Sequence, residues 1–531
     1  MPHPLDGDAL AVSDGDMTDP PRCTIGTATM TPADVVAVAR DDVGVELAPE
    51  AVSAIADTRR TVDAIAAGDR PAYGVSTGFG ALATRHIPTE LRAKLQRSLI
   101  RSHAAGSGPE VEREVVRAMM LLRLRTLASG RTGVRVEVAQ LLAGLLDAGI
   151  TPVVHEHGSL GCSGDLAPLA HVALALQGEG EVHDADGTLR PAAAALTAAG
   201  LVPVELAAKE GLALINGTDG MLGMLLLAAD DLHRLLSTAD LAAAMSIEAL
   251  LGTDRVFAAD LQALRPHLGQ AASAGNLRRL LADSPIVASH RTTECPLVQD
   301  AYSLRCAPQV HGAARDTLAH ADRVAAVELE SMIDNPVVTL DGRIESNGNF
   351  HGAPIAYVLD FLAIPVADVA SMSERRTDRA LDVARNHGLP PFLADDPGVD
   401  SGHMIAQYTA ASIVSELKRL AVPASVDSIP SSAMQEDHVS MGWSAARKLR
   451  RAVDGLTQVL AIEVLTAARA LDLRAPLRPG PATGAALTTV REHVPGPGPD
   501  RHLAPEIAAV TRLVRSGALL DAVTDVTGPL A

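Results

Sequence analysis

The chain has 531 residues, of which 47% are hydrophobic and 21% charged, a composition typical of a folded globular protein with about three domains. Its formal net charge of -19 argues against nucleic acid or an anionic membrane as the main partner. The four cysteines, Cys23, Cys162, Cys295 and Cys306, form no CxxC pair and no metal-ligand spacing, which favours a reducing compartment.

The sequence also bears on where the protein is found. The longest apolar run, residues 220–229, is closed by aspartates on both sides and is too short to span a bilayer. The N-terminus carries Asp and Pro where a signal peptide needs Lys or Arg before an apolar stretch. We therefore expect a cytoplasmic protein with no membrane anchor. Residues 1–21, rich in Asp, Gly and Pro, predict a flexible acidic tail.

Two early segments carry polar side chains of interest. Helical patterns begin at Thr31, a good N-cap. Residues 73–80 are too glycine-rich for a helix and predict a loop that can place the phenol of Tyr73 against a ligand. Residues 95–106 predict a helix that ends at a glycine, with His103 near its C-terminus. A histidine in that position more often interacts with the helix end than with a ligand.

The most informative stretch is GSLGCSGDLAPLAH, residues 158–171. Glycines bracket Cys162-Ser163-Gly164, and the run becomes helical at Asp165, a possible N-cap, with Pro tolerated in the first turn. The triplet should therefore lie at the positive end of a helix dipole. A tightly bent Xaa-Ser-Gly can let the Gly164 nitrogen attack the carbonyl carbon of Cys162. Loss of two waters would leave a five-membered ring with an exocyclic methylidene, an electrophile made from the backbone.

Two polar motifs follow further along the chain. An apolar strip over residues 210–215 runs into Asn216-Gly, which in isolation is a turn signal. Gln299, Tyr302 and Arg305 are spaced at i, i+3 and i+6, so on a helix they would share roughly one side. An arginine fork suits a carboxylate, although a surface ion pair is the commoner role for an arginine.

Two further loops complete the set. Residues 346–352 form a polar, glycine-bearing loop whose one aromatic is Phe350. Residues 434–442 place Glu436 and a second carboxylate next to a histidine, which on its own is typical of a solvated helix start.

Most of the remaining chain predicts helix. Apolar residues recur at three- or four-residue intervals from Leu449 to Leu471, giving a long stripe on one helix, and strands with period-two alternation are hard to find. Residues 476–499, rich in Pro and Gly, predict a connection to a short C-terminal helical segment after about residue 480. We expect a mainly α protein with a central bundle of long helices. Its parts would be the tail, a smaller N-terminal domain over 22–128 with the Tyr73 loop, and a helical-bundle domain over 129–531.

In this order, the motifs resemble the aromatic amino acid ammonia-lyase family over essentially the whole chain from about residue 25. That family forms 4-methylideneimidazol-5-one (MIO) autocatalytically from an Ala-Ser-Gly triplet. Here Cys162 stands where Ala is usual; ring closure uses only its backbone carbonyl, so the thiol should not block it. No P-loop, dinucleotide fingerprint or metal spacing indicates an external cofactor or metal. The resemblance implies an ammonia-lyase and fumarase type of bundle, and a homotetramer in which several subunits contribute to each site.

The resemblance also implies a role for each candidate residue. Tyr73 would be the catalytic base or a proton shuttle, and Asp165 would be needed for ring formation rather than turnover. Arg305 would bind the substrate carboxylate. The remaining supporting positions are Tyr302 and Asn216 beside that carboxylate, and Gln299 and Phe350 lining the site.

His103 and Glu436 fall where histidine-specific members of the family carry His and Glu. Both are polar groups suited to an imidazole, and a hydrogen-bonding site discriminates strongly against an apolar ring. The expected reaction is deamination of L-histidine to trans-urocanate and ammonia, the first step of histidine degradation, and Glu436 could also move a proton. A tyrosine ammonia-lyase or an aminomutase would share the prosthetic group, and Glu436 is the feature that discriminates. A non-catalytic bundle protein is disfavoured by the intact triplet, Tyr73 and Arg305.

Overall fold

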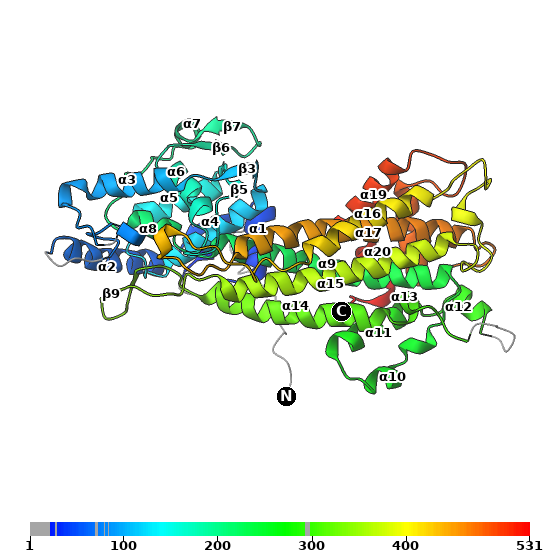
Figure 1. Cartoon of the computed structure of the whole chain (residues 1–531). Coiled ribbons are helices and arrows are strands. Elements are labelled where there is room, and N and C mark those ends of the chain that lie inside the picture. Colours follow the sequence, from blue (N-terminus) through cyan, green and yellow to red (C-terminus); the bar gives the residue numbers. More distant parts are fainter. Residues whose placement is uncertain (1–21, 27–28, 69–72, 79, 83, 292–297) are drawn as a thin grey trace.

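The computed structural model describes residues 22–26, 29–68, 73–78, 80–82, 84–291 and 298–531. The predicted tail, residues 1–21, lies outside the described residues. Within them, twenty α-helices account for most of the chain and nine short strands for little of it. The structure therefore confirms the mainly α prediction (Figure 1).

Four long helices run lengthwise and pack side by side as a central bundle (Figure 1). They are α9 (Asp219–Ala249), α14 (Ala307–Glu330), α15 (Ala353–Leu381) and α17 (Gly442–Asp472). We call the two ends of this bundle the α8 end and the α13 end, after the short helices that lie there.

The first part of the chain gathers towards the α8 end (Figure 1). Its helices are α1 (Pro32–Arg40), α2 (Pro49–Ala66), α3 (Arg92–His103), α4 (Arg113–Ala128), α5 (Val136–Asp147), α6 (Leu166–Leu176), α7 (Ala192–Ala198) and α8 (Glu210–Ile215). The α13 end carries α10 (Ala259–Ala263), α11 (Leu268–Leu280), α12 (Pro285–Ser289), α13 (Tyr302–Arg305), α16 (Met404–Leu420), α18 (Pro481–His493), α19 (Leu503–Ser516) and α20 (Ala518–Thr527).

The strands form four small sheets. β1 (Arg22–Ile25) pairs in parallel with β2 (Gly44–Leu47). The antiparallel pairs are β3 (Ser107–Glu110) with β5 (His155–His157), β4 (Thr151–Pro152) with β6 (Glu181–His183), β6 with β7 (Leu189–Pro191), and β8 (Val337–Val338) with β9 (Ile344–Glu345). With two to four residues each, these strands fix loops rather than build a core.

The core is made mainly of Leu, Ala and Val from the bundle helices. The stripe predicted on α17 is buried along its length, which confirms its helical period. Its members are Leu449, Val453, Leu456, Leu460, Val464 and Leu471. Among the described residues, α15 is the one helix long and apolar enough to cross a membrane, but 61% of its apolar window is buried inside the protein, as expected of a core helix.

Two local expectations were wrong. The helical segment expected after about residue 480 is confirmed, because α18 begins at Pro481, but the connection expected over residues 476–499 is wrong, because α18 occupies Pro481–His493. Pro481 lies in the first turn, where a missing N–H costs nothing, and the apolar positions after it pack inward. Gln299, Tyr302 and Arg305 do not share a helix, because α13 begins at Tyr302 and Gln299 lies before it.

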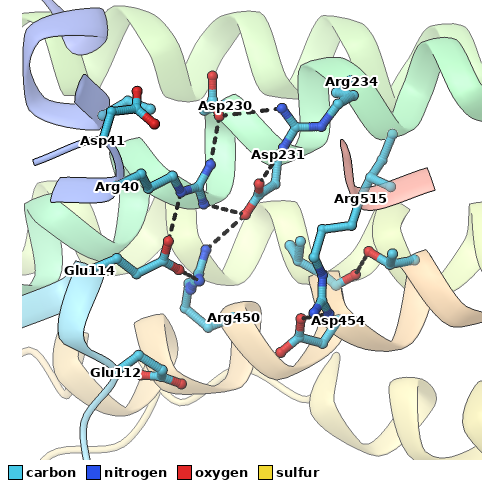
Figure 2. A pocket seen from close by; sticks show the side chains of 14 residues that line it. Arg40, Asp41, Glu112, Glu114, Asp230, Asp231, Arg234, Arg450, Asp454 and Arg515 are labelled. Atoms are coloured by element: carbon cyan, nitrogen blue, oxygen red, sulfur yellow. Dashed lines mark hydrogen bonds and ion pairs between the residues drawn. The ribbon is translucent and has the colours of Figure 1, made fainter. Parts of the chain in front are cut away.

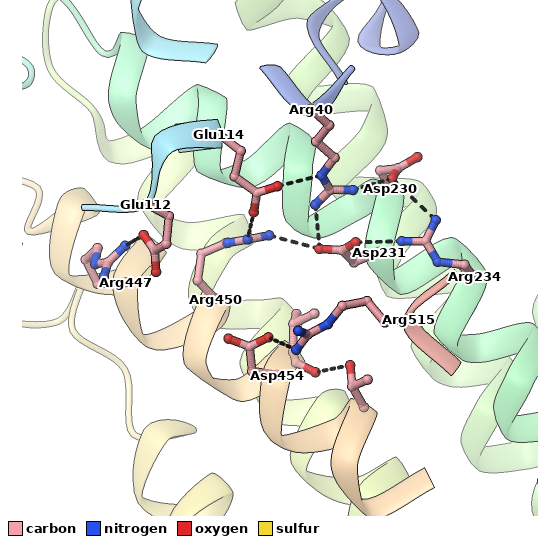
Figure 3. A network of polar contacts seen from close by, with 12 residues as sticks. Arg40, Glu112, Glu114, Asp230, Asp231, Arg234, Arg447, Arg450, Asp454 and Arg515 are labelled. Carbon is pink, nitrogen blue, oxygen red and sulfur yellow. Dashed lines mark hydrogen bonds and ion pairs between the residues drawn. The ribbon is translucent and has the colours of Figure 1, made fainter. Parts of the chain in front are cut away.

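A network of ion pairs joins α1 and α4 to the bundle. Arg40 contacts Glu114 at 2.6 Å, Asp230 at 2.7 Å and Asp231 at 2.8 Å, and Arg450 of α17 pairs with Asp231 at 2.9 Å (Figure 3). The same charges line a cavity of about 670 Å³ (Figure 2). Its guanidinium groups are already engaged by carboxylates, so we assign this cavity a structural role.

The domain boundary at residue 128 stays a prediction.

Candidate active site

A second cavity, of about 860 Å³, opens at the α8 end of the bundle. It gathers side chains from the early loop, from α3, from the triplet loop, from the end of α8 and from the segment before α17. Five candidate residues named from the sequence line it together: Tyr73, His103, Ser163, Asn216 and Glu436.

The triplet loop is held in a tight bend against the segment after α8. Gly164 has a φ of +76°, and a Cβ there would lie 1.9 Å from the carbonyl oxygen of Gly217. The next amide, that of Asp165, donates a 2.7 Å hydrogen bond to the same oxygen. Only glycine combines this conformation with so close an approach. The bend therefore depends on the third residue of the triplet.

Asp165 occupies the N-cap position of α6 but does not cap the helix through its side chain. Its carboxyl instead accepts hydrogen bonds from Ser159 Oγ and from the Met221 amide, each at 2.9 Å. Complete burial outweighs these hydrogen bonds and raises the pKa of Asp165 to about 7. The expected N-cap contact is thus replaced by a tie between the triplet loop and the start of α9.

Glu436 faces the triplet. Ser163 Oγ donates to Glu436 Oε1 at 3.4 Å, and Ser431 Oγ donates to Oε2 at 2.7 Å. Burial, assisted by the charge of Glu436, raises the pKa of the Cys162 thiol to about 12. The thiol is therefore neutral near pH 7, and it is a weak nucleophile there because the thiolate is the reactive form.

His103 is the last residue of α3, and its Nδ1 lies 2.9 Å from the carbonyl oxygen of Leu99. A carbonyl only accepts, so Nδ1 carries the proton and Nε2 is left as an acceptor. Burial lowers the pKa of His103, partly opposed by the Leu99 carbonyl and by the charge of Glu436. Across the cavity, the hydroxyl of Tyr73 accepts a 3.3 Å hydrogen bond from the Gly80 amide.

Asn216 follows α8 directly and is 3% exposed. Its Nδ2 donates a 2.7 Å hydrogen bond to the carbonyl oxygen of Asn335. Its Oδ1 is buried and accepts no hydrogen bond from the described part of the chain. Asn335 also lines the cavity but was missed by the sequence analysis, although its Asn-Pro dipeptide is a turn signal.

Arg305, Tyr302 and Gln299 lie outside this cavity, at the α13 end. The Arg305 guanidinium lies 4.8 Å from the centre of the Tyr302 ring, and Tyr302 is 70% exposed. None of the carboxylates in the described ranges forms an ion pair with Arg305, so the surface ion pair considered for it is not seen.

The distance between the two ends can be estimated along α9, because side-chain contacts connect α13 to the far end of that helix. The carbonyl of Ser303 accepts from Arg376, whose ion-pair partner Glu463 also accepts from Ser246 of α9. Ser246 lies near the end of a 31-residue helix that begins just after Asn216. At 1.5 Å per residue, the α13 end is about 40 Å from the cavity. Within one chain, Arg305 therefore does not reach Ser163.

Phe350 lies at the α8 end, in the loop before α15, but does not line the cavity. The adjacent His351 stacks on His438 with ring centroids 5.5 Å apart, beside the Glu436 segment. In the described ranges, no group of three or more His, Cys, Asp or Glu side chains could hold a metal ion.

The family model for aromatic amino acid lyases matches residues 30–492. The chain belongs to the aromatic amino acid lyase family. It is 66% identical over 508 residues to a protein of Streptomyces avermitilis named histidine ammonia-lyase, covering 96% of this chain and 99% of that one. A protein of Streptomyces coelicolor with the same name is 65% identical over 507 residues, covering 95% and 99%.

Solved structures of the family have the same fold. A tyrosine aminomutase from Streptomyces globisporus superposes with a TM-score of 0.91 at 38% identity, covering 96% of this chain and 100% of that one. The histidine ammonia-lyase from Trypanosoma cruzi gives 0.87 at 38% identity, covering 95% and 96%. This family membership makes the chain a carbon–nitrogen lyase and confirms the ammonia-lyase architecture expected from the sequence.

Proposed function

We propose that this lyase is a cytoplasmic histidine ammonia-lyase, which converts L-histidine to trans-urocanate and ammonia without oxidation, as the first step of histidine degradation. The observation that carries the proposal is that His103 and Glu436 line the same cavity as Ser163. The relatives at 65 and 66% identity that bear the same name support it.

The triplet fits the MIO group. The positive φ of Gly164 and its contact with Gly217 favour a bent backbone, which ring closure needs. Ring closure joins the Gly164 nitrogen to the carbonyl carbon of Cys162, whose oxygen leaves as water. The hydroxyl of Ser163 and its α-hydrogen leave as the second water and give the methylidene. When formed, this ring supplies the electrophile that makes loss of the substrate's ammonia easier.

Recognition of the imidazole depends on which atoms of the site accept hydrogen bonds. His103 Nε2 is an acceptor because its Nδ1 proton is committed to Leu99, and the carboxylate of Glu436 is an acceptor as well. A protonated imidazole ring brings two N–H donors to such a pair, whereas the ring of phenylalanine brings none. A site with unpaired polar groups rejects the apolar ring strongly.

Tyr73 is placed to handle a proton. Tyr73 lines the cavity, and its hydroxyl accepts a hydrogen bond from the Gly80 amide. We assign it the removal or relay of the substrate's β-hydrogen as a proton. Glu436, hydrogen-bonded to Ser163 and Ser431, is the second group able to move a proton in this cavity.

The substrate carboxylate requires a second copy of the chain. Arg305, which we assign to that carboxylate, lies about 40 Å from its own chain's cavity by the helix rise. The homotetramer expected for the family resolves this by bringing the α13 end of one subunit to the α8 end of another.

The exposed face of α14 and α15 supports this assembly. Tyr357, Phe361 and Ile364 of α15 are 48%, 46% and 53% exposed, and Phe361 stacks with His320 of α14 at 6.5 Å. Such an apolar patch on a soluble surface marks a contact site. The two helices span the bundle, so a two-fold axis through the patch would lay the α13 end of one copy over the α8 end of the other.

An aminomutase is the second candidate, favoured by the likeness to the tyrosine aminomutase at a TM-score of 0.91. Both reactions would use the same triplet, so substrate choice is what separates them. Glu436 favours an imidazole over a phenol, because a protonated imidazole brings two N–H donors, one for each acceptor, whereas a phenol brings a single O–H.

The test is ultraviolet absorbance of the purified protein with L-histidine, L-tyrosine and L-phenylalanine in parallel, together with the intact mass. We expect urocanate from histidine alone and a mass two waters below that of the sequence. The Ser163→Ala protein should lack both the mass deficit and the activity. An acrylate product from tyrosine would replace the proposed substrate, and an active Ser163→Ala protein would overturn the mechanism.

A further inference from the structure

Glu436 closes a short loop with Ser431. The Ser431 amide donates to the Glu436 carbonyl at 2.9 Å, and the Glu436 amide donates to the Ser431 carbonyl at 3.3 Å, so the two residues form an antiparallel bridge. Their side chains meet as well, because Ser431 Oγ donates to Glu436 Oε2 at 2.7 Å. Three hydrogen bonds therefore join the residue that faces the triplet to a serine a few positions before it.

The residues between them have an unfavourable backbone. Ser432, Ala433 and Met434 have φ values of 50°, 51° and 69°. All three lie in the left-handed region, where a Cβ comes too close to the following carbonyl oxygen. They are also exposed, so burial offsets little of this strain. Strain of this kind persists only where surrounding contacts enforce it, and it gathers at functional sites. Here the enforced geometry places Glu436 opposite Ser431.

The two carboxylate oxygens of Glu436 have different partners. Oε1 accepts from Ser163 Oγ at 3.4 Å, and Oε2 accepts from Ser431 Oγ. In the ring closure proposed above, the Ser163 hydroxyl leaves as water, which frees Oε1 but not Oε2. The carboxylate then presents one acceptor to the substrate and keeps the other for Ser431. A side chain held in this way loses less rotamer freedom when a ligand binds.

Ser431 acts on the cavity only through Glu436. The cavity is lined by Ser432, Ala433 and Glu436 but not by Ser431. The two backbone hydrogen bonds hold the bridge together without the Ser431 hydroxyl, so the loop does not need that hydroxyl to close. What the hydroxyl adds is the orientation of the carboxylate.

We propose that Ser431 is a positioning residue whose hydroxyl holds Glu436 Oε2, so that Oε1 faces an N–H of the substrate imidazole. This inference rests on the proposed function, because it takes L-histidine as the substrate. It assigns part of the choice of substrate to a residue outside the cavity.

Three variants of the full-length protein test this role. Ser431→Ala removes the hydroxyl. Ser431→Thr retains it, on an extended backbone with a φ of -137° that suits a β-branched residue. Ser428→Ala is the matched control, because Ser428 Oγ accepts from the Val439 amide at 3.0 Å in the same segment and has no hydrogen bond to Glu436 among the described residues. Intact mass, kcat and KM for L-histidine are measured for each.

We expect Ser431→Ala to keep the mass deficit of two waters and to raise the KM for L-histidine about tenfold, the effect of one lost hydrogen bond. Its kcat should change little, because the contact with the imidazole is made in the ground state and in the transition state alike. Ser431→Thr and Ser428→Ala should retain the wild-type KM. An unchanged KM in Ser431→Ala, a loss confined to kcat, or an equal loss in either of the other two variants would overturn the proposal.

A double-mutant cycle measures the coupling to Glu436. Its probe is imidazole-4-propionate, which keeps the ring and the carboxylate of the substrate and lacks the ammonium group; binding is measured by titration calorimetry. Ser431→Ala should weaken binding about tenfold in the wild-type background and add no further loss in the Glu436→Ala background. Additive losses would mean that Ser431 acts independently of Glu436, against the proposal.

A second pair of variants applies if Ser431→Ala does not fold or lacks the mass deficit. Ser431→Val and Ser431→Thr have similar shapes and differ in the hydroxyl, so the valine variant should have the higher KM by about tenfold, and equal KM values would contradict the inference. A wild-type protein that makes no urocanate from histidine would remove the proposed function itself. An active wild type with an unchanged KM in Ser431→Ala would remove only this inference.

Discussion

At the scale of single residues, the cavity holds two kinds of group. His103 and Glu436 accept hydrogen bonds, and the phenol of Tyr73 is the group assigned to proton transfer. Replacing Tyr73 by Phe keeps the ring and removes the hydroxyl that accepts from Gly80. We expect Tyr73→Phe to keep the mass deficit of two waters, since the hydroxyl has no contact with the triplet among the described hydrogen bonds. Its kcat should fall by about 10²- to 10⁴-fold, the usual contribution of a positioned acid or base.

Intact mass and initial rates of urocanate formation measure these two properties separately. Tyr408→Phe serves as the control, because Tyr408 lies on α16 and is 60% exposed. A Tyr73→Phe protein with the wild-type kcat would remove Tyr73 from the proton transfer.

The buried carboxyl of Asp165 should make stability depend on pH. Its pKa is about 7 in the folded chain and near 3.8 in the unfolded one. Between these values the folded protein holds a proton that the unfolded chain lacks, so stability falls as the pH rises. From pH 5 to pH 7 this group should remove about 2 kcal/mol. Above pH 8 it should change nothing further.

The measurement compares the melting temperature of Ser163→Ala with that of Ser163→Ala/Asp165→Asn, so that neither protein forms the ring. The first should lose stability relative to the second between pH 5 and pH 7. Parallel curves over that range would mean that Asp165 is already ionised in the folded protein.

At the scale of elements, the contact between the triplet loop and the segment after α8 should be required for ring formation. A Cβ on Gly164 would lie 1.9 Å from the Gly217 oxygen, so Gly164→Ala must open the hydrogen bond between Asp165 and Gly217. We expect this variant to lose the mass deficit and about 1–3 kcal/mol of stability. Gly187→Ala is the matched control, because Gly187 has a φ of +82° but nothing within 4 Å of its Cβ. Ring formation in Gly164→Ala would contradict this account of the bend.

The elements also show what the sequence could and could not predict. The apolar stripe of α17, the N-cap at Thr31 and the position of His103 near the C-terminus of α3 depend on local period and local polar groups, and all three agree with the structure. The helix itself ends at His103, three residues before the glycine at which it was expected to end. Asp165 did not behave as a local cap, because Met221, far along the chain, competes for its carboxyl. Asn335 was missed for the same reason: its importance comes from the carbonyl it presents to Asn216, which no local pattern records.

At the scale of the whole molecule, the site predicted from the sequence is split between the two ends of the bundle. The motif order placed Tyr73, Ser163 and Glu436 in one site, and one chain brings them together. It also placed Arg305 there, but α9 separates the two groups by nearly its full length. Sequence reasoning names residues that act together and cannot say which copy supplies them. That information lies in the assembly.

Complementation between two inactive variants tests that assembly. Ser163→Ala keeps Arg305 but forms no ring, and Arg305→Ala forms the ring but lacks the guanidinium. If each site takes Ser163 from one subunit and Arg305 from another, random mixing of the two chains makes about a quarter of the sites intact. Co-expression in equal amounts should therefore restore about a quarter of the wild-type kcat, while each variant alone stays inactive. Phe361→Asp, on the exposed face of α15, should abolish this recovery, and light scattering should then no longer detect the tetramer that we expect for the wild type. The control is the chain carrying both Ser163→Ala and Arg305→Ala, co-expressed with Ser163→Ala, which provides no intact Ser163 and should stay inactive. Failure of the two single variants to complement, in a confirmed mixed oligomer, would place Arg305 and Ser163 in the same subunit's site or remove Arg305 from the reaction.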